Sequence, residues 1–142
     1  MNTAANIVEF EQEDIRADEP LVVILASGPE DDGKRATLAY SAAVTSLGMD
    51  TPTRLFLVGD GAFWAYEGHT SGFRMPGFPA LSDLVEAFSE LGGETWICST
   101  CDQFCGVPSD GHHGGRSRRP DVQPRGMASI LPEVAMGSSI TF

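Results

Sequence analysis

Short apolar runs and helix-forming segments alternate along the chain. The first apolar run, LVVILA at residues 21–26, has no polar interruption, which is typical of a strand buried on both faces of a parallel sheet. Similar short runs lie at residues 55–58 and 95–98, and SSITF at residues 138–142 predicts a last strand. The pattern therefore predicts several short strands that share one sheet.

Segments with helical spacing lie between these runs. KRATLAYSAAVTSL at residues 34–47 is rich in helix formers and stops at a glycine. ALSDLVEAFSELGG at residues 80–93 is amphipathic, and Ser82 is its expected N-cap. Its apolar positions are Leu81, Leu84, Val85, Phe88 and Leu91. MASILPEVAMG at residues 127–137 predicts a further helix that Pro132 starts or interrupts. Because strands and helices alternate, we expect an α/β fold with a parallel sheet covered on both sides.

The composition excludes several classes of partner. The 142 residues fit one domain, predicted at residues 20–142. Nine lysines and arginines against 20 acidic residues give a net charge of −11, which disfavours nucleic acid and anionic membranes. Residues 1–19 hold many of the acids, and we expect them to form a flexible acidic tail. The apolar runs are too short to cross a bilayer, and the N-terminus lacks a signal-peptide pattern, so we expect a cytoplasmic protein without membrane contact.

Three cysteines lie within eight residues. Cys98, Cys101 and Cys105 are spaced i, i+3 and i+7, so a helical CSTCDQFC segment places their sulfurs on one face. Cys98 ends an apolar run at the edge where parallel sheets place their ligand sites, and Ser99 or Thr100 can cap the following helix. A helix N-terminus stabilises a thiolate. We therefore expect Cys98 to be a reactive thiol that solvent reaches, with Cys101 as a second thiol able to form a disulfide with it.

Two other readings of the cysteines stay open. Cys98 can be a small apolar residue that ends a buried strand, since cysteine is often buried. Alternatively, Cys98, Cys101, Cys105 and a loop histidine, His112 or the adjacent His113, form a Cys₃His zinc set. The three cysteines alone could hold an iron–sulfur cluster with an open position. Because the spacing matches no familiar ligand pattern, a thiol site without a cofactor is the first hypothesis.

Several further residues are candidates of lower weight. Asp60, between two glycines after the second strand, is predicted as a turn residue, with a place in a pocket at the same sheet edge as the alternative. His69 is expected to make a local hydrogen bond. Residues 107–125 are predicted as a Gly/Arg/His-rich loop whose four arginines are solvated, with an anion site as the alternative. In that loop, His112 and His113 can act as base or ligand if the loop folds over the cysteines.

Several segments together carry a resemblance to a known family. They are SGPEDDGKRATLAYSAA, LFLVGDG, MPGFPALSDLVEAFSELGG, the CSTC site with a glycine eight residues after its first cysteine, and the terminal SSITF. In this order they resemble the DsrE-like proteins, which are small sulfur-relay proteins that include the TusD-type carriers. The resemblance covers residues 20–106 and 126–142.

The resemblance implies a flavodoxin-like three-layer sandwich with a mostly parallel sheet of about five strands. It also implies assembly into a homotrimer or hexamer, and transfer of persulfide sulfur between a donor and an acceptor protein. In that family the carrier cysteine precedes such a glycine, so the role falls on Cys98 ahead of Gly106, with Cys101 as the second cysteine. Some relatives are labelled peroxiredoxins, which keeps a thiol-redox role open.

The first functional hypothesis is therefore an intracellular sulfur carrier or sulfurtransferase in which Cys98 holds the persulfide and Cys101 assists its release. The second is a zinc or iron–sulfur protein that uses the cysteine cluster. The third is a structural or regulatory oligomer whose thiols are incidental.

Overall fold

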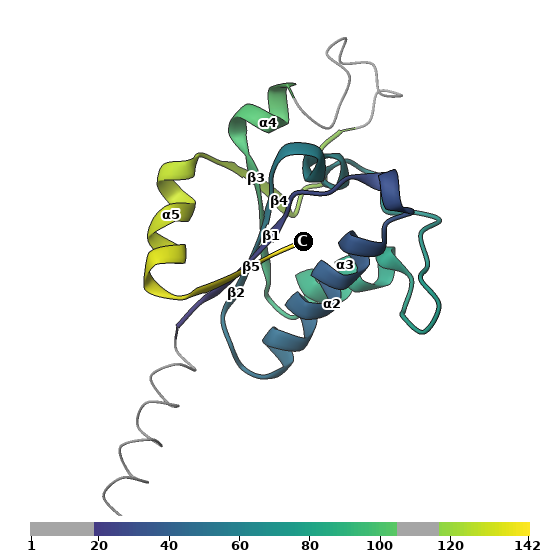
Figure 1. Cartoon of the computed structure of the whole chain (residues 1–142), viewed down its shortest axis with the longest axis horizontal. Coiled ribbons are helices and arrows are strands. Elements are labelled where there is room, and N and C mark those ends of the chain that lie inside the picture. Colours follow the sequence, from purple (N-terminus) through teal and green to yellow (C-terminus); the bar gives the residue numbers. More distant parts are fainter. Residues whose placement is uncertain (1–18, 105–116) are drawn as a thin grey trace, which may run out of the picture.

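A five-stranded parallel sheet lies at the centre of the molecule (Figure 1). The structure is a computed structural model that describes residues 19–104 and 117–142. The strands are β1 (Leu21–Leu25), β2 (Thr53–Leu57), β3 (Glu94–Cys98), β4 (Val122–Arg125) and β5 (Ser138–Thr141). Their order is β4-β3-β2-β1-β5, and every neighbouring pair is parallel. The α/β fold with a five-stranded sheet is thereby confirmed.

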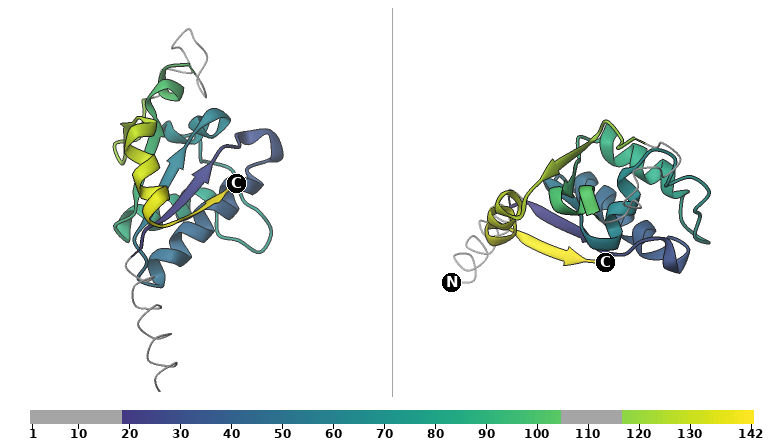
Figure 2. Two further views of the ribbon diagram at one scale, coloured as in Figure 1. Left: turned by 60° about the vertical axis from the view of Figure 1, so that its left-hand side comes forward. Right: turned by 90° about the horizontal axis from the view of Figure 1, so that it is seen from above.

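Helices cover both faces of this sheet and complete three layers (Figures 1 and 2). On one face, α2 (Lys34–Gly48) packs against α3 (Leu81–Glu90). On the other face, α5 (Met127–Met136) crosses the sheet. Three short helices lie in connections: η1 (Pro29–Asp31), η2 (Gly59–Ala65) and α4 (Ser99–Phe104). Within the described ranges, none of the helices has the length and apolarity that a membrane span requires.

The path of the chain sends its connections to both faces of the sheet. Strands β1 to β4 follow one another across the sheet, and α5 then carries the chain back to put β5 beside β1. The connections after β1 and β2 lead to the α2/α3 face, whereas the connection after β4 leads to the α5 face. Open α/β sheets bind their ligands outside the carboxyl ends of the strands, and Cys98 is the last residue of β3 at this edge.

Some details of the sequence-based prediction are wrong for physical reasons. Ser82 lies inside α3, whose N-cap is Ala80, and Leu91 follows the helix and is 54% exposed. Pro132 lies inside α5, which starts five residues earlier.

Strand β4 occupies part of the predicted 107–125 loop. Its sequence VQPR has a single buried residue because it is an edge strand, where proline is tolerated, so the hydrophobic pattern does not reveal it. The predicted acidic tail at residues 1–19 lies outside the described residues, apart from Glu19.

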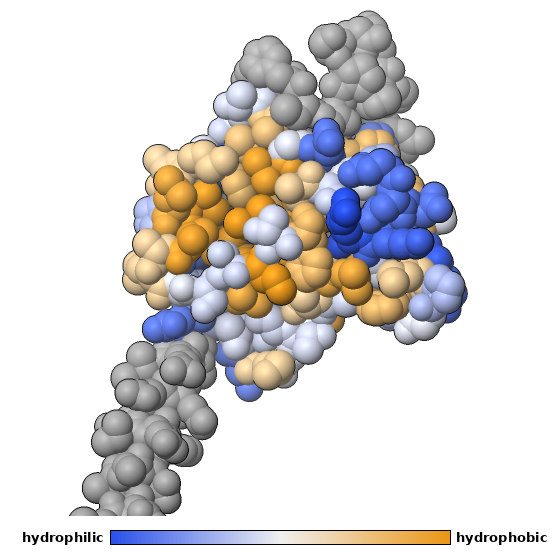
Figure 3. Space-filling view, in the orientation of Figure 1, coloured by the Kyte–Doolittle hydropathy of each residue, from blue (hydrophilic) through white to orange (hydrophobic). Residues whose placement is uncertain are grey.

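Apolar side chains are exposed along α5 and at the β5 edge of the sheet. All four residues of β5 are exposed, and this strand pairs only with β1 among the described strands. The exposed large side chains here are Met127, Leu131 and Met136 on α5, Ile140 on β5 and Met49 after α2. A groove of about 820 Å³ runs between α2 and the β1/β5 edge. Figure 3 shows a broad apolar surface that extends from α5 toward the centre of this view.

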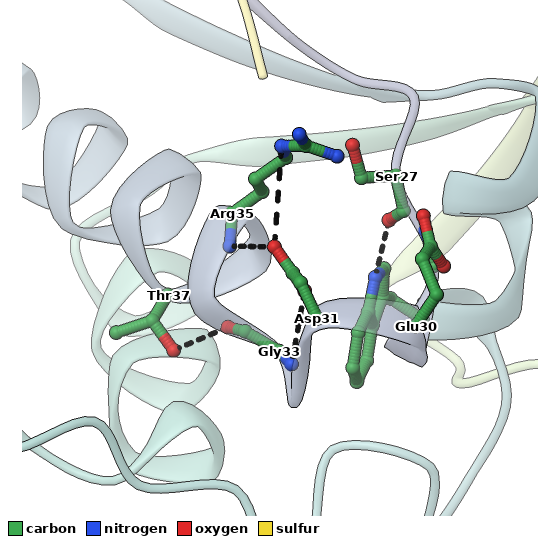
Figure 4. A network of polar contacts seen from close by, with 8 residues as sticks. Ser27, Glu30, Asp31, Gly33, Arg35 and Thr37 are labelled. Carbon is green, nitrogen blue, oxygen red and sulfur yellow. Dashed lines mark hydrogen bonds and ion pairs between the residues drawn. The ribbon is translucent and has the colours of Figure 1, made fainter.

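Polar contacts hold the turn that leads from β1 into α2 (Figure 4). The Asp31 carboxylate accepts hydrogen bonds from the backbone N–H groups of Gly33 (3.1 Å) and Arg35 (3.0 Å). The Thr37 hydroxyl donates to the Gly33 carbonyl oxygen at 2.7 Å. A carboxylate at this position satisfies N–H groups that a helix start leaves unpaired and is favoured by the helix dipole.

Helix η2 packs directly on the carboxyl end of β1. The Trp64 side chain is fully buried, and its Nε1–H donates to the Ser27 carbonyl oxygen at 2.8 Å. A Cβ atom on Gly61 would collide with the carbonyl oxygen of Leu25. Only glycine therefore permits this close approach, which determines where the residues at the start of η2 lie.

We expect Gly61→Ala to lower the free energy of unfolding by about 1–3 kcal/mol, because the added methyl group forces η2 away from β1. Gly48→Ala is the matched control, since a Cβ there meets no atom within 4 Å, and it should leave stability unchanged or raise it slightly. Urea denaturation followed by circular dichroism measures both. Equal stability of the two variants would show that η2 is not packed as described.

Candidate functional site

Cys98 is the last residue of β3 and lies at the carboxyl edge of the sheet, as predicted. Helix α4 begins at the next residue, so Cys98 itself precedes the first turn, and the expected caps Ser99 and Thr100 lie inside the helix. In the register with β4, Cys98 pairs with Arg125. Its side chain shares a sheet face with Trp96. Arg54, which lies over Trp96, also pairs with Glu133 of α5, so this is the α5 face.

Cys101 lies one turn into α4 and approaches a different connection. The backbone N–H of Gly59 donates to the Cys101 Sγ at 3.2 Å. Gly59 is the first residue of η2, which follows β2. A backbone N–H aimed at sulfur favours the thiolate over the thiol, because the hydrogen bond to the charged form is the stronger one. Sequence reasoning missed Gly59, although its place after the second strand put it at the same sheet edge.

Cys98 and Cys101 do not share one helix face. The prediction required CSTCDQFC to be helical throughout, but Cys98 still belongs to β3 and only Cys101 belongs to α4. In the described part of the chain, Cys98 and Cys101 are not joined in a disulfide. Cys105, His112 and His113 lie outside the described residues.

Both thiols are buried, which corrects the expectation of a thiol open to solvent. Cys98 is 7% exposed and Cys101 is 8% exposed. The reason is that the first turn of α4 folds onto the sheet edge and onto η2. The groove beside α2 lies at the β1/β5 edge and is lined by neither cysteine. A reagent or partner therefore reaches these sulfurs only when their cover moves.

Asp102, next to Cys101, joins α4 to two other segments. The Tyr66 hydroxyl lies 2.9 Å from Asp102 Oδ1 and 3.0 Å from the Asp102 carbonyl oxygen. Arg118 Nη1 lies 2.7 Å from Asp102 Oδ2, an ion pair with charge-assisted hydrogen bonding. Tyr66 follows η2, and an isolated antiparallel bridge links it to Arg118. The three side chains therefore hold α4 against η2 and against the segment before β4.

Arg119 anchors that segment in the core. It is 9% exposed, its Nη2–H donates to the Tyr40 hydroxyl at 3.1 Å, and its Nε lies 3.3 Å from Asp121 Oδ1 as an ion pair without hydrogen-bond geometry. Burial acts to lower the pKa of Arg119, but Tyr40 and Asp121 outweigh it and the net pKa is raised. Arg119 therefore stays charged.

The prediction of solvated arginines in this region is wrong for Arg119, which is buried. Arg118 and Arg125 are half-buried: Arg118 pairs with Asp102, and the Arg125 guanidinium lies 5.5 Å from the centre of the Trp96 ring. Arg54 lies over the same ring at 5.2 Å. Cation–π contacts of this kind position the guanidinium groups over the α5 face of β3.

The remaining candidates, Asp60 and His69, have local structural roles. Asp60 is an exposed residue in the first turn of η2, which agrees with its prediction as a turn residue. His69 Nδ1 lies 2.7 Å from the Phe63 carbonyl oxygen, and its ring stacks on Phe63 with centroids 4.1 Å apart. Because a carbonyl oxygen can only accept, this contact places a proton on Nδ1, and the predicted local hydrogen bond is confirmed.

A metal site is not assembled by the described residues alone. Within residues 19–104 and 117–142, no group of three or more His, Cys, Asp or Glu side chains is arranged to hold a metal ion. The predicted set also uses Cys105 and His112, which lie outside those ranges, so zinc and iron–sulfur binding stay predictions.

The fold and the sequence together define the class of the protein. The model of the DsrE/DsrF-like family matches residues 21–140, and the chain belongs to this family. The chain is similar to the uncharacterized protein MJ0760 of Methanocaldococcus jannaschii, with 29% identity over 76 residues, which is 54% of this chain. The match spans 28% of that relative's length.

Two solved structures share the fold. The ychN protein of E. coli has a TM-score of 0.61 and 15% identity, over 88% of this chain and 99% of that one. BT1422 of Bacteroides thetaiotaomicron has a TM-score of 0.51 and 16% identity, over 86% of this chain and 94% of that one. At these identities the likeness establishes the fold alone, and the family is associated with sulfur relay.

We expect Arg119→Met to lower the free energy of unfolding by about 1.5–3 kcal/mol, because Tyr40 and Asp121 lose a buried charged partner. The matched control is Arg35→Met, whose ion pair with Asp31 at 4.0 Å is largely exposed and should contribute less than about 0.5 kcal/mol. Urea denaturation compares the two. An Arg119 variant as stable as the Arg35 variant would contradict the anchoring role.

Proposed function

We propose that this protein is a sulfur carrier of the sulfurtransferase type, which holds sulfane sulfur as a persulfide on Cys98 and passes it to a partner protein. One observation carries the proposal: two thiols lie at the carboxyl edge of the sheet, and a backbone N–H supports the sulfur of the second. Membership in the DsrE/DsrF-like family supports the same chemistry. We place the protein in the cytoplasm, where reducing conditions keep both thiols available.

The loading step is an exchange between sulfurs. The Cys98 thiolate attacks the outer sulfur of a donor persulfide, so that an S–S bond forms on Cys98 while the donor's S–S bond breaks. The electron pair leaves with the donor thiolate, and there is no net oxidation. An acceptor thiolate then attacks the same outer sulfur, and Cys98 becomes the leaving thiolate.

Cys101 supplies a second outlet for the bound sulfur. Its thiolate can attack the inner sulfur of the Cys98 persulfide, which forms a Cys98–Cys101 disulfide and releases hydrosulfide. In that step the two thiols are oxidised and the sulfane sulfur is reduced, so a thiol reductant must restore the pair. The Gly59 N–H favours the thiolate that this attack requires.

The burial of both thiols assigns the partner a further role. Cys98 and Cys101 are nearly inaccessible, so docking of the donor or acceptor has to displace the first turn of α4 before sulfur is exchanged. This helix has six residues and therefore has little stability of its own. Such a cover also protects a persulfide from water and oxidants between transfers.

We expect the wild-type chain, incubated with a persulfide donor, to gain about 32 Da, one sulfur atom, in intact-mass analysis. Cys98→Ser should lose this gain, whereas Cys101→Ser should retain it and release hydrosulfide more slowly. Cys105→Ser tests the third cysteine in the same assay. Sulfur uptake that survives in Cys98→Ser and is lost in Cys101→Ser would move the carrier role to Cys101.

Elemental analysis of the purified protein separates this function from the metal alternative. A metal centre would be favoured by two results together. The protein would bind zinc or iron in stoichiometric amount, and Cys105→Ser or His112→Ala would lose both the metal and the uptake of sulfur. A peroxiredoxin-like role would instead show disulfide formation with peroxide and no uptake of sulfur.

We further propose that the chain forms a homotrimer or hexamer through the exposed apolar surface of α5 and β5. The support is the group of exposed side chains around Leu131, Met136 and Ile140, together with the outer edge of β5 (Figure 3). A contiguous exposed apolar surface is typical of an interface between protein chains. The chain is acidic, so two copies repel each other, but α5 and β5 carry one charged residue, Glu133, which limits this repulsion where these elements meet.

We expect the double variant Leu131→Glu, Met136→Glu to run as a single chain of 15.1 kDa in light scattering, because two buried carboxylates would oppose association. Leu91→Glu, also an exposed leucine but at the end of α3, is the matched control and should leave the assembly intact. A wild-type protein that already runs as a monomer would remove this proposal.

A further inference from the structure

We propose that Asp102 and Tyr66 are positioning residues for the thiol site: together with Arg118 they form a latch that holds Cys101 Sγ against the Gly59 N–H. The inference rests on the proposed function, because it concerns how the second thiol of the carrier is held beside the N–H that stabilises its thiolate form. It goes further in assigning a role to side chains that touch no substrate.

The latch reaches α4 at the residue next to Cys101. Tyr66 approaches both the carboxylate and the backbone carbonyl of Asp102, at 2.9 and 3.0 Å, so it restrains the main chain as well as the side chain. Arg118 holds the second carboxylate oxygen at 2.7 Å. Both oxygens of Asp102 are thereby engaged from two separate segments, and the orientation of the first turn of α4 is determined.

Both sides of the latch are themselves rigidly attached. Tyr66 directly follows η2, which also carries Gly59 and is fixed on β1 by Trp64 and Gly61. Arg118 precedes the buried Arg119, whose backbone N–H donates to the Ala65 carbonyl oxygen at 2.8 Å. The donor N–H and the latch therefore belong to one framework, while α4 is the element that has to be held to it.

Because Asp102 is charged, the direction in which its substitution shifts the ionisation of the Cys101 thiol tests the proposal. A carboxylate near a thiolate disfavours the thiolate through space, so removing its charge alone makes the thiol ionise at lower pH. Loss of the latch has the opposite effect, because Cys101 loses the Gly59 N–H and ionises at higher pH. A role limited to general stability would not shift the ionisation in either direction.

The experiment measures the pH dependence of alkylation by iodoacetamide in the full chain with Cys98→Ser and Cys105→Ser, which leaves Cys101 as its thiol. The midpoint of the profile is compared, because a looser α4 also increases the absolute rate through easier access. We expect Tyr66→Phe to raise the midpoint by about 0.5–1 pH unit, as loss of one hydrogen bond to a charged sulfur predicts. Asp102→Asn should raise it as well.

Thr53→Val is the matched control. It removes a buried hydroxyl that donates to Ser46 at the start of β2, at the other end of the strand from Gly59, and should leave the midpoint unchanged. A midpoint that stays constant or falls in both Tyr66→Phe and Asp102→Asn would overturn the proposal. If Tyr66→Phe fails to fold by circular dichroism, the direction of the shift in Asp102→Asn decides alone. Because no sulfur donor is used, failure of persulfide loading leaves this test intact, and the two proposals fail independently.

Discussion

The position of the thiol site depends on the close contact between η2 and the carboxyl end of β1. Gly61 lets the two backbones meet, and the Trp64 indole donates to Ser27 across the same junction. This contact determines where the N–H of Gly59 points and therefore where a sulfur on the next connection can be stabilised. The core below it, where Tyr40 packs edge to face on Phe88, supports the junction from the α2/α3 side.

A second constraint comes from a charge buried in this core. Arg119 is held by Tyr40 and Asp121, and it fixes the segment that brings Arg118 to Asp102. A buried charge has to keep its partners because leaving it unpaired costs much more than the pair contributes. The two adjacent arginines therefore have different roles. Arg119 fixes the path of the chain before β4, and Arg118 contacts the helix that bears Cys101.

Much of the fold could be predicted because it follows from local patterns. Apolar runs and helical spacing located β1, β2, β3, α2, α3, α5 and β5. Strand β4 escaped prediction because an edge strand with glutamine, proline and arginine lacks an apolar pattern. At the site, the place of Cys98 at a strand end follows from the sequence. The roles of Gly59, Tyr66 and Arg118 do not, since each depends on contacts between segments far apart in the chain.

The two tryptophans of the chain lie in different elements near the thiol site. Trp64 belongs to η2, whereas Trp96 lies two residues before Cys98, beneath the guanidinium groups of Arg54 and Arg125. Cations close to an indole ring alter its fluorescence, so we expect the emission spectrum of Trp96 to differ from that of Trp64, although both side chains are buried. The molecule therefore carries one intrinsic optical probe in η2 and another in β3, and a rearrangement near either can be followed in light emission without an added label.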